Sequence, residues 1–195
     1  MKKKLTTLVL LLAFAAVAVT GGTLAYFTDT ENATNTFTMG NVAIELYEAK
    51  VNPDTWIAVG ENVTTTSNVY NNLYPGAVVI KNPTIKNVGN NPCYVRIQAT
   101  NLDAVVYMTG TTENALGEHW KLENGYFYYE EPLTKDMVTT ALFDKIKIPT
   151  TLTNGATIND ITITAHAIQS EGFAAADDKT ALQKAWEAFD AQPTT

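Results

Sequence analysis

Residues 120–129 read Trp-Lys-Leu-Glu-Asn-Gly-Tyr-Phe-Tyr-Tyr, and this stretch is the clearest sign of the fold class. Two runs of strand-forming residues meet there at Asn124-Gly125. A two-residue connection of this kind favours a type I′ turn, because both of its central residues need a positive φ angle. The stretch therefore predicts a β-hairpin.

Alternation of apolar and polar residues continues on both sides of this hairpin. In 158–168 the pattern places Ile161, Ile163, Ala165 and Ala167 inward and Thr162, Thr164 and His166 outward. Similar alternation is found at Val42, Ile44 and Leu46, at 93–99 and at 143–148. This repeated two-residue period predicts an all-β chain that folds as a β-sandwich.

The segment 93–99 shows how the two faces of one strand differ. One face carries Tyr94, Arg96, Gln98 and, just beyond, Thr100, a polar set that suits solvent or a cross-strand partner. Cys93 lies on the other face, and as the single cysteine of the chain it allows no internal disulfide. We expect it to be buried as a small hydrophobic residue. Further upstream, Pro83 cannot donate to a ladder and indicates a strand start or a sheet edge.

The period changes only at the end of the chain. Leu182, Ala185, Trp186 and Phe189 share one face of a helix. Asp177 and Asp178 precede them and are expected to cap the helix and to complement its dipole. We therefore predict one C-terminal amphipathic helix that packs on the sandwich.

The first 25 residues have the pattern of an export signal. Lys2, Lys3 and Lys4 are followed by the apolar run 8–19 and by Thr23-Leu24-Ala25, a small-residue cleavage site. Twelve helical residues rise about 18 Å, short of the roughly 30 Å hydrocarbon core. Cleavage between Ala25 and Tyr26 is therefore expected, with the membrane involved only in the precursor. An uncleaved anchor is the alternative.

Charge and composition exclude one class of partner. The formal net charge is −7, and loss of three lysines with residues 1–25 makes it −7 − 3 = −10. Arg96 is the single arginine of the chain. Binding to phosphates requires clustered cations, so nucleic acid is not expected as a partner.

Motifs for catalysis are missing from the sequence. His119 and His166 are the two histidines, whereas a catalytic zinc site usually takes three protein ligands and a general base. His119 stands at a predicted strand start and is expected to be an exposed polar residue, and His166 to be a surface histidine. We therefore predict a protein that is not an enzyme, with no catalytic residues, no metal site and no cofactor.

Several segments together resemble one family of exported proteins of Gram-positive bacteria. The family contains the biofilm fibre protein TasA and camelysin, and its members are processed by the dedicated signal peptidase SipW. The resemblance begins with residues 21–46, GGTLAYFTDTENATNTFTMGNVAIEL. It continues at Tyr74-Pro75-Gly76, at 81–89 (Lys-Asn-Pro-Thr-Ile-Lys-Asn-Val-Gly), at Tyr94-Val95-Arg96, at 125–129, at Leu142-Phe143 and at 165–169.

This resemblance implies a secreted subunit with a jelly-roll-like β-sandwich, located in the extracellular matrix or on the cell surface. Its copies would polymerise into biofilm matrix fibres by lending an N-terminal strand to a neighbour. The chain would then divide into a signal peptide (1–25), a donor-strand-like segment (26–36) and a sandwich domain with its helix (37–195). The implied partners are further copies of the chain, SipW and an accessory matrix protein.

The chemistry of the segment 26–36 agrees with a donated strand. It is rich in threonine and able to pair with an unpaired sheet edge, yet too polar to stay docked alone. The residues expected to act in polymerisation are Tyr26, Phe27, Thr28, Thr30, Asn32 and Thr34. Asp29 and Glu31 share a face with Phe27, so insertion is expected to leave these two acids at the rim of an acceptor.

Three alternatives remain open from the sequence. Residues 26–36 could be a disordered tail. The resemblance to camelysin implies a metallopeptidase that would use His119, His166 and nearby acids. A monomeric surface adhesion module would use the aromatic residues 126–129, whose more conventional role is to stabilise the hairpin across its strands.

Overall fold

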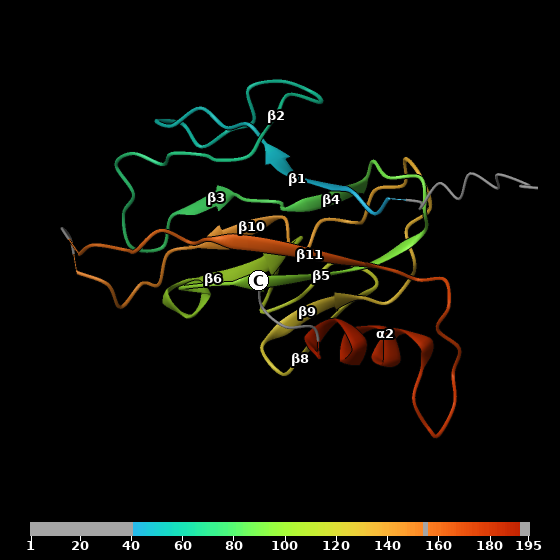
Figure 1. Ribbon diagram of the computed structural model, residues 1–195. Helices are drawn as coiled ribbons and strands as arrows, with labels where there is room; N and C mark the ends of the chain where they lie inside the picture. The colour runs from blue at the N-terminus through green and yellow to red at the C-terminus, as the bar shows by residue number, and fades with distance from the viewer. Residues whose placement is uncertain (1–40, 154–155, 192–195) are drawn as a thin grey trace, which may run out of the picture. The chain divides into compact units, whose positions relative to one another are not determined.

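The computed structural model describes residues 41–153 and 156–191, which all belong to one compact unit, Gly40–Thr195. Antiparallel strands dominate this part of the chain (Figure 1), with one short 3₁₀ helix and one α-helix. The strands are β1 (Ile44–Ala49), β2 (Thr64–Thr65), β3 (Val78–Ile80), β4 (Thr84–Asn87), β5 (Cys93–Ala99), β6 (Val106–Thr109), β7 (Thr112–Glu113), β8 (Trp120–Glu123), β9 (Tyr126–Tyr129), β10 (Lys145–Lys147) and β11 (Ile163–Gln169). The helices are η1 (Leu102–Ala104) and α2 (Ala181–Asp190).

One layer of the fold combines two small sheets, β2-β1-β4 and β3-β10-β6-β7. The two sheets meet where β3 continues into β4. There the N–H of Lys81 donates to the carbonyl of Asp144, and the N–H of Leu142 donates to the carbonyl of Pro83. Pro83 directly precedes β4, which confirms the predicted strand start.

The other layer is the four-stranded sheet β11-β5-β9-β8. Its β8–β9 hairpin turns at Asn124 and Gly125, whose φ angles of 50° and 82° are both positive. This is the predicted type I′ geometry. The longest ladder pairs β11 with β5 over seven residues of each strand, from Ile163↔Ala99 to Gln169↔Cys93.

The main hydrophobic core lies between these layers. Phe127 of β9 packs against Tyr107 of β6, and Tyr107 stacks on Phe143. Val95 and Ile97 of β5 are fully buried in the same core. Cys93 is fully buried as predicted, and burial raises the pKa of its thiol to about 11. The predicted β-sandwich is thus confirmed, whereas the jelly-roll topology stays a prediction.

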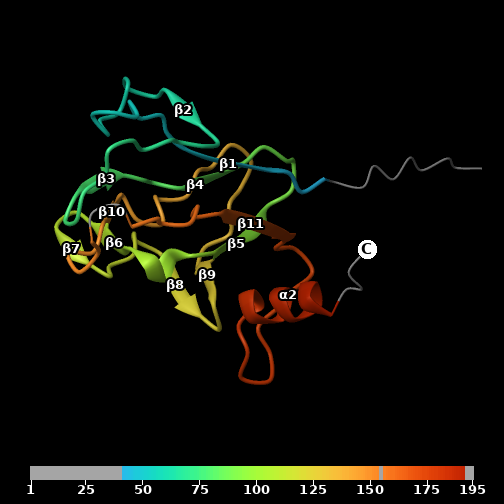
Figure 2. The ribbon, with the colours of Figure 1, turned by 90° about the vertical axis from the view of Figure 1, so that its left-hand side faces the viewer.

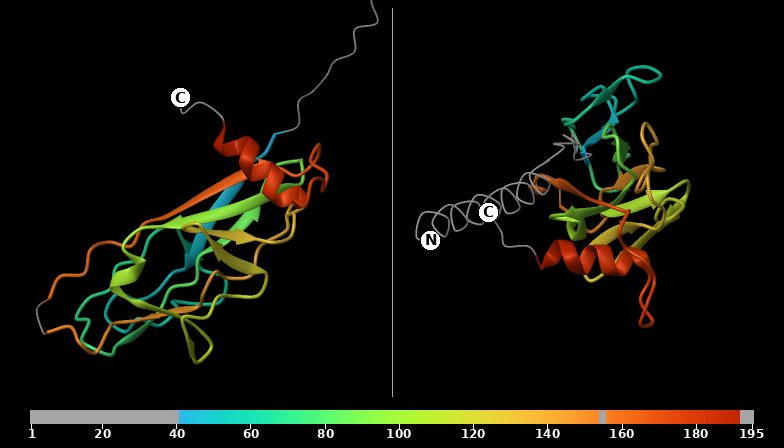
Figure 3. Two further views of the ribbon diagram at one scale, coloured as in Figure 1. Left: turned by 90° about the horizontal axis from the view of Figure 1, so that it is seen from below. Right: turned by 45° about the vertical axis from the view of Figure 1, so that its right-hand side comes forward.

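Helix α2 covers the outer face of the second layer (Figures 2 and 3). Its Trp186 and Ala185 are buried against Tyr94 of β5, which confirms the predicted amphipathic helix. The predicted cap is wrong. Thr180 begins the helix with a capping box to Gln183, while Asp177 and Asp178 lie in the preceding turn with positive φ angles.

The helix also changes the environment of the polar face of β5. Arg96 and Tyr94 were predicted to face solvent or a cross-strand partner, but they are only 1% and 9% exposed because α2 lies over them. Gln98, beyond the reach of the helix, is exposed. Among the described residues, α2 is the longest helix. It has ten residues, too few to cross a bilayer.

Candidate functional site

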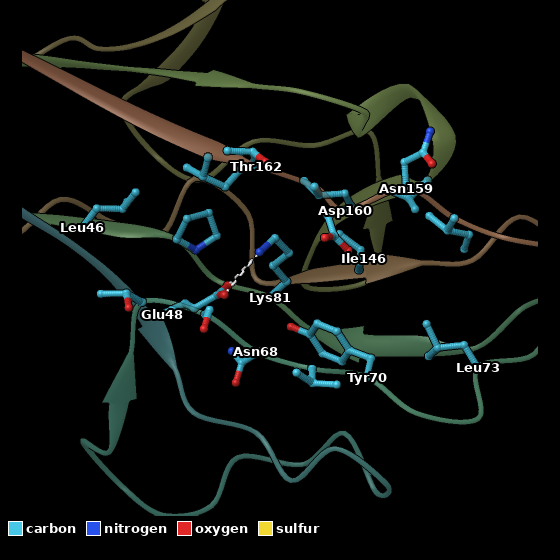
Figure 4. A pocket seen from close by; sticks show the side chains of 18 of the residues that line it. Leu46, Glu48, Asn68, Tyr70, Leu73, Lys81, Ile146, Asn159, Asp160 and Thr162 are labelled. Atoms are coloured by element: carbon cyan, nitrogen blue, oxygen red, sulfur yellow. Dashed lines mark hydrogen bonds and ion pairs between the residues drawn. The ribbon is translucent and has the colours of Figure 1, made fainter.

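A groove of about 600 Å³ opens between β1 and β11, on the side of the sandwich where the two layers have their edges. We call it the edge groove. One wall is formed by Leu46–Glu48 of β1 and the loop 66–70, and the other by Ile158–Ile163. Figure 4 shows Glu48 and Asn68 on one side and Asp160 and Thr162 on the other.

The two strands that border the edge groove each have a free edge. Residues Ile44–Tyr47 of β1 pair with β4 on one side only, because β2 reaches only Glu48 and Ala49. β11 pairs with β5 alone. Within the described residues, the facing edges therefore carry backbone N–H and C=O groups without a strand partner, the arrangement that accepts an added strand.

The floor of the groove combines apolar side chains with one buried ion pair. Leu73, Ile146 and Ile148 supply apolar surface. Lys81 Nζ lies 3.1 Å from a carboxylate oxygen of Glu48, and both side chains are less than one-tenth exposed. An extended segment with both apolar and polar side chains would find partners on this floor.

Polar groups of the 66–70 loop are fixed in place. Asn68 bridges the backbone of Ala49 and Val51, and the hydroxyl of Tyr70 donates to the carbonyl of Ile80 at 2.7 Å. Burial, helped by the negative charge of Glu48, raises the pKa of Tyr70 above its ordinary value. Tyr70 therefore stays a neutral hydrogen-bonding group throughout the physiological range.

The wall Ile158–Ile163 of the groove and the start of β1 lie towards opposite ends of the sandwich. Asn41 and Ala43 are hydrogen-bonded to the turn 88–91, next to Cys93, and Cys93 pairs with the last residue of β11. The wall Ile158–Ile163 lies at the other end of β11, about 20 Å away at 3.3 Å per residue. β1 and β11 accordingly run in opposite directions (Figure 1).

The predicted aromatic cluster 126–129 is not an exposed surface. Phe127 and Tyr129 are buried in the main core, each 5% exposed. Tyr126 and Tyr128 point to the other face, where Tyr128 contacts Trp186 and Tyr126 lies 3.9 Å from the guanidinium carbon of Arg96. The aromatic residues of the hairpin thus stabilise the core and the helix. Little of their surface is left to bind a partner, as the adhesion alternative would require.

The two histidines lie on opposite faces of the second layer. His119 packs against the core residue Tyr129, with Glu118 and Glu131 at 3.7 Å and 3.4 Å from its ring nitrogens. His166 packs between Tyr126 and Phe189, so its prediction as a surface residue was wrong because α2 covers it. Burial, and then the charge of Arg96, lower the pKa of His166.

These positions do not fit the zinc site of a metallopeptidase. Among residues 41–153 and 156–191, no three His, Cys, Asp or Glu side chains converge in a way that could hold a metal ion. A catalytic zinc usually needs three such ligands. The part of the chain that the structure describes therefore supplies no three-ligand group of the kind that a catalytic zinc takes.

The residues predicted for cleavage and polymerisation cannot be placed. They are Ala25, Tyr26, Phe27, Thr28, Thr30, Asn32 and Thr34, and all of them lie outside the described residues. The edge groove itself was missed from the sequence. Its loop 66–70 belongs to a polar stretch without periodicity, and only the isolated Tyr70 inside that stretch signals a packed segment.

Comparison with known proteins identifies the family. A family model described as camelysin metallo-endopeptidase matches residues 1–183 of the 195. No curated protein matches the chain. No solved structure matches it either. Because the family model covers most of its length, the chain belongs to the camelysin family, the family that its sequence motifs resemble.

Proposed function

We propose that this protein is an exported structural subunit that polymerises by placing residues 26–36 in the edge groove of the next copy. The observation that carries the proposal is the groove between the free edges of β1 and β11. Membership of the camelysin family, and the resemblance of its N-terminal motifs to fibre-forming proteins, support the same conclusion.

The donor segment is longer than the free edge of β11, which borders the groove at Ile163. Eleven extended residues span about 36 Å at 3.3 Å per residue. The free edge of β11 has seven residues, or about 23 Å. Residues 26–36 are therefore long enough to pair along the whole edge. Their threonines suit a strand, and their backbone groups would satisfy the unpaired groups of β1 and β11.

The positions of groove and donor on one molecule favour an open polymer. A copy that donates from the start of β1 and accepts near Ile158–Ile163 uses two different surfaces, so the contact is heterologous. Heterologous contacts that do not close into a ring produce filaments. Cleavage after Ala25 would release the donor segment and so begin assembly.

The first experiment compares protein that begins at Tyr26 with protein that begins at Phe37. The longer form should produce filaments under the electron microscope, and the shorter form should stay monomeric. A synthetic peptide of residues 26–36 should bind to the shorter form. Filaments from the shorter form would reject the donor role.

A substitution in the groove sharpens this experiment. Ile161→Lys places a charge on the groove wall and should abolish both filaments and peptide binding. Leu122→Lys is the matched control, because Leu122 is 48% exposed on β8 and does not line the groove. Equal loss in both variants would show that the charge acts elsewhere.

The family description favours a second candidate function, a metallo-endopeptidase. Elemental analysis should then find zinc bound to the pure protein, and a chelator should stop its proteolysis. Because the described residues supply no three-ligand group, we expect neither result. Zinc together with chelator-sensitive cleavage would establish the enzyme and would point to ligands outside those residues.

A further inference from the structure

The sequence motif at 81–89 holds both ends of β1. At the end of the strand, the side-chain oxygen of Asn82 accepts from the N–H of Ala49 at 2.8 Å. At the start, the N–H groups of Val88 and Gly89 donate to the carbonyl of Ala43 at 2.9 Å and 3.0 Å. β1 is thus fixed by more than its ladder with β4.

Gly89 makes the close contact at the start of β1 possible. A Cβ atom at this position would lie 2.6 Å from the carbonyl oxygen of Asn41 and 2.7 Å from the backbone nitrogen of Ala43. Both neighbours are backbone atoms, which cannot rotate away as a flexible side chain can. A residue with a side chain would therefore push 41–43 off the turn.

Asn87 makes this turn rigid. It is fully buried, and its side-chain oxygen accepts from the N–H of Gly89 at 2.9 Å. Its side-chain nitrogen donates to the carbonyls of Asn91 and Leu133, each at 2.9 Å. The acceptor and both donors of the amide are thus used inside the protein, which ties the turn to a distant segment of the core.

We propose that Asn82, Asn87 and Gly89 form a clamp that couples the strand a molecule donates to the groove in which it accepts one. This inference rests on the proposed function. β1 follows the donor segment in the chain, and its Leu46–Glu48 form one wall of the edge groove. A force on the donated strand acts first on Asn41. Through the hydrogen bonds of the clamp, this force then acts on β1 and on the core.

Asn82, Asn87 and Gly89 are positioning residues in this proposal, because none of them lines the edge groove. Asn87 and Gly89 fix the direction in which the chain enters β1, and with it the angle between successive subunits, while Asn82 fixes the end of the strand. A filament of clamped subunits is stiff, because bending at Asn41 is resisted by the hydrogen bonds of Asn41 and Ala43 to the turn 88–91. The motif thus determines the stiffness of the polymer and does not change the affinity of the groove for the donated strand.

The test uses Gly89→Ala in protein that begins at Tyr26. Filament persistence length, measured by electron microscopy, should fall severalfold, while the shorter form carrying the same change should bind the 26–36 peptide as tightly as its parent. Gly60→Ala is the matched control, because a Cβ there meets only a methyl group of Val63 at the ordinary distance of 3.4 Å. An unchanged persistence length in Gly89→Ala would overturn the proposal.

A second variant decides the question if Gly89→Ala does not fold. Two glycines inserted between Gly40 and Asn41 leave the contacts of Asn82, Asn87 and Gly89 in place and place more chain between the donor segment and the clamp. Filaments of this variant should also be severalfold more flexible, and filaments as stiff as those of the parent would contradict the clamp.

Hydrogen exchange separates failure of the clamp from failure of the proposed function. In Gly89→Ala, the amide of Val88 should exchange about tenfold faster than in the parent. If the parent neither forms filaments nor binds the peptide, the donor hypothesis fails. Unchanged protection of Val88 would then reject the clamp independently.

Discussion

At the scale of single residues, Arg96 is a buried charged side chain that requires a partner of opposite charge. It is 1% exposed, and its guanidinium carbon lies 4.4 Å from the ring of Trp186 and 5.0 Å from that of Phe189. Two hydrogen bonds to the carboxylate of Asp190 satisfy its charge, at 3.0 Å and 2.5 Å. A buried cation is tolerated only with such a partner, so the strand and the helix depend on each other.

Asp190→Ala should therefore loosen α2. The change leaves the guanidinium of Arg96 buried without its carboxylate, and we expect a loss of about 2 kcal/mol in the free energy of unfolding. The half-exposed position of Asp190 keeps the loss below the value for a fully buried pair. Denaturant titration followed by tryptophan fluorescence measures it.

Lys179→Ala is the control for this experiment. Lys179, just before the N-cap of α2, pairs with Glu187 of that helix, but both side chains are about half exposed. Exposed pairs contribute little, so the free energy of unfolding should change by less than about 0.5 kcal/mol. Equal losses in the two variants would mean that the buried pair Arg96–Asp190 contributes no more to the free energy of unfolding than the exposed pair Lys179–Glu187.

At the scale of elements, local patterns predicted well and long-range packing did not. The Asn124-Gly125 turn and the apolar face of α2 are encoded within a few residues, and both are present in the structure. The burial of Arg96 and the partial burial of His166 could not be predicted, because both depend on a helix that begins 85 residues after Arg96 and 15 after His166. Strand alternation cannot reveal that a distant element covers the polar face.

The docking of α2 should also depend on pH through His166. Its ring packs against Phe189, and its Nδ1 is buried without a partner among the described residues. Burial and the charge of Arg96 lower the pKa of His166, and Asp190 opposes this shift. Protonation therefore favours the undocked helix, so stability is full above the ordinary histidine pKa of 6.5 and falls as the pH drops through it.

Thermal unfolding measured from pH 8 to about pH 5 checks this prediction. The midpoint should fall at the acidic end in the parent and should change less in His166→Leu, which keeps an apolar group under Phe189. The window stays above the range of Asp190, whose pKa is lowered by its hydrogen bond from Arg96 and whose own contribution is lost only at more acidic pH. Parallel curves for parent and variant would exclude His166 as the cause.

At the scale of the whole molecule, the sandwich combines a closed core with an open side at the edge groove. α2 covers the outer face of the second layer, and β1 and β11 leave their facing edges unpaired within the described residues. An exposed pair of strand edges invites association, and natural proteins usually protect such edges. The groove could not be predicted from the sequence, because it exists only where two edges from different layers come together.

An open edge that accepts a donated strand should also accept the same strand as a free peptide. Peptide 26–36, added to protein that begins at Tyr26, would occupy the groove at the growing end of a filament. Because the peptide brings no groove of its own, no further copy can be added and growth should stop there. Mean filament length, measured by electron microscopy, should fall as the ratio of peptide to protein rises. A peptide with the same residues in scrambled order should leave the length unchanged, because its side chains no longer stand at the positions that face the groove. Filaments of equal length with both peptides would mean that the subunits are held together by contacts outside the edge groove.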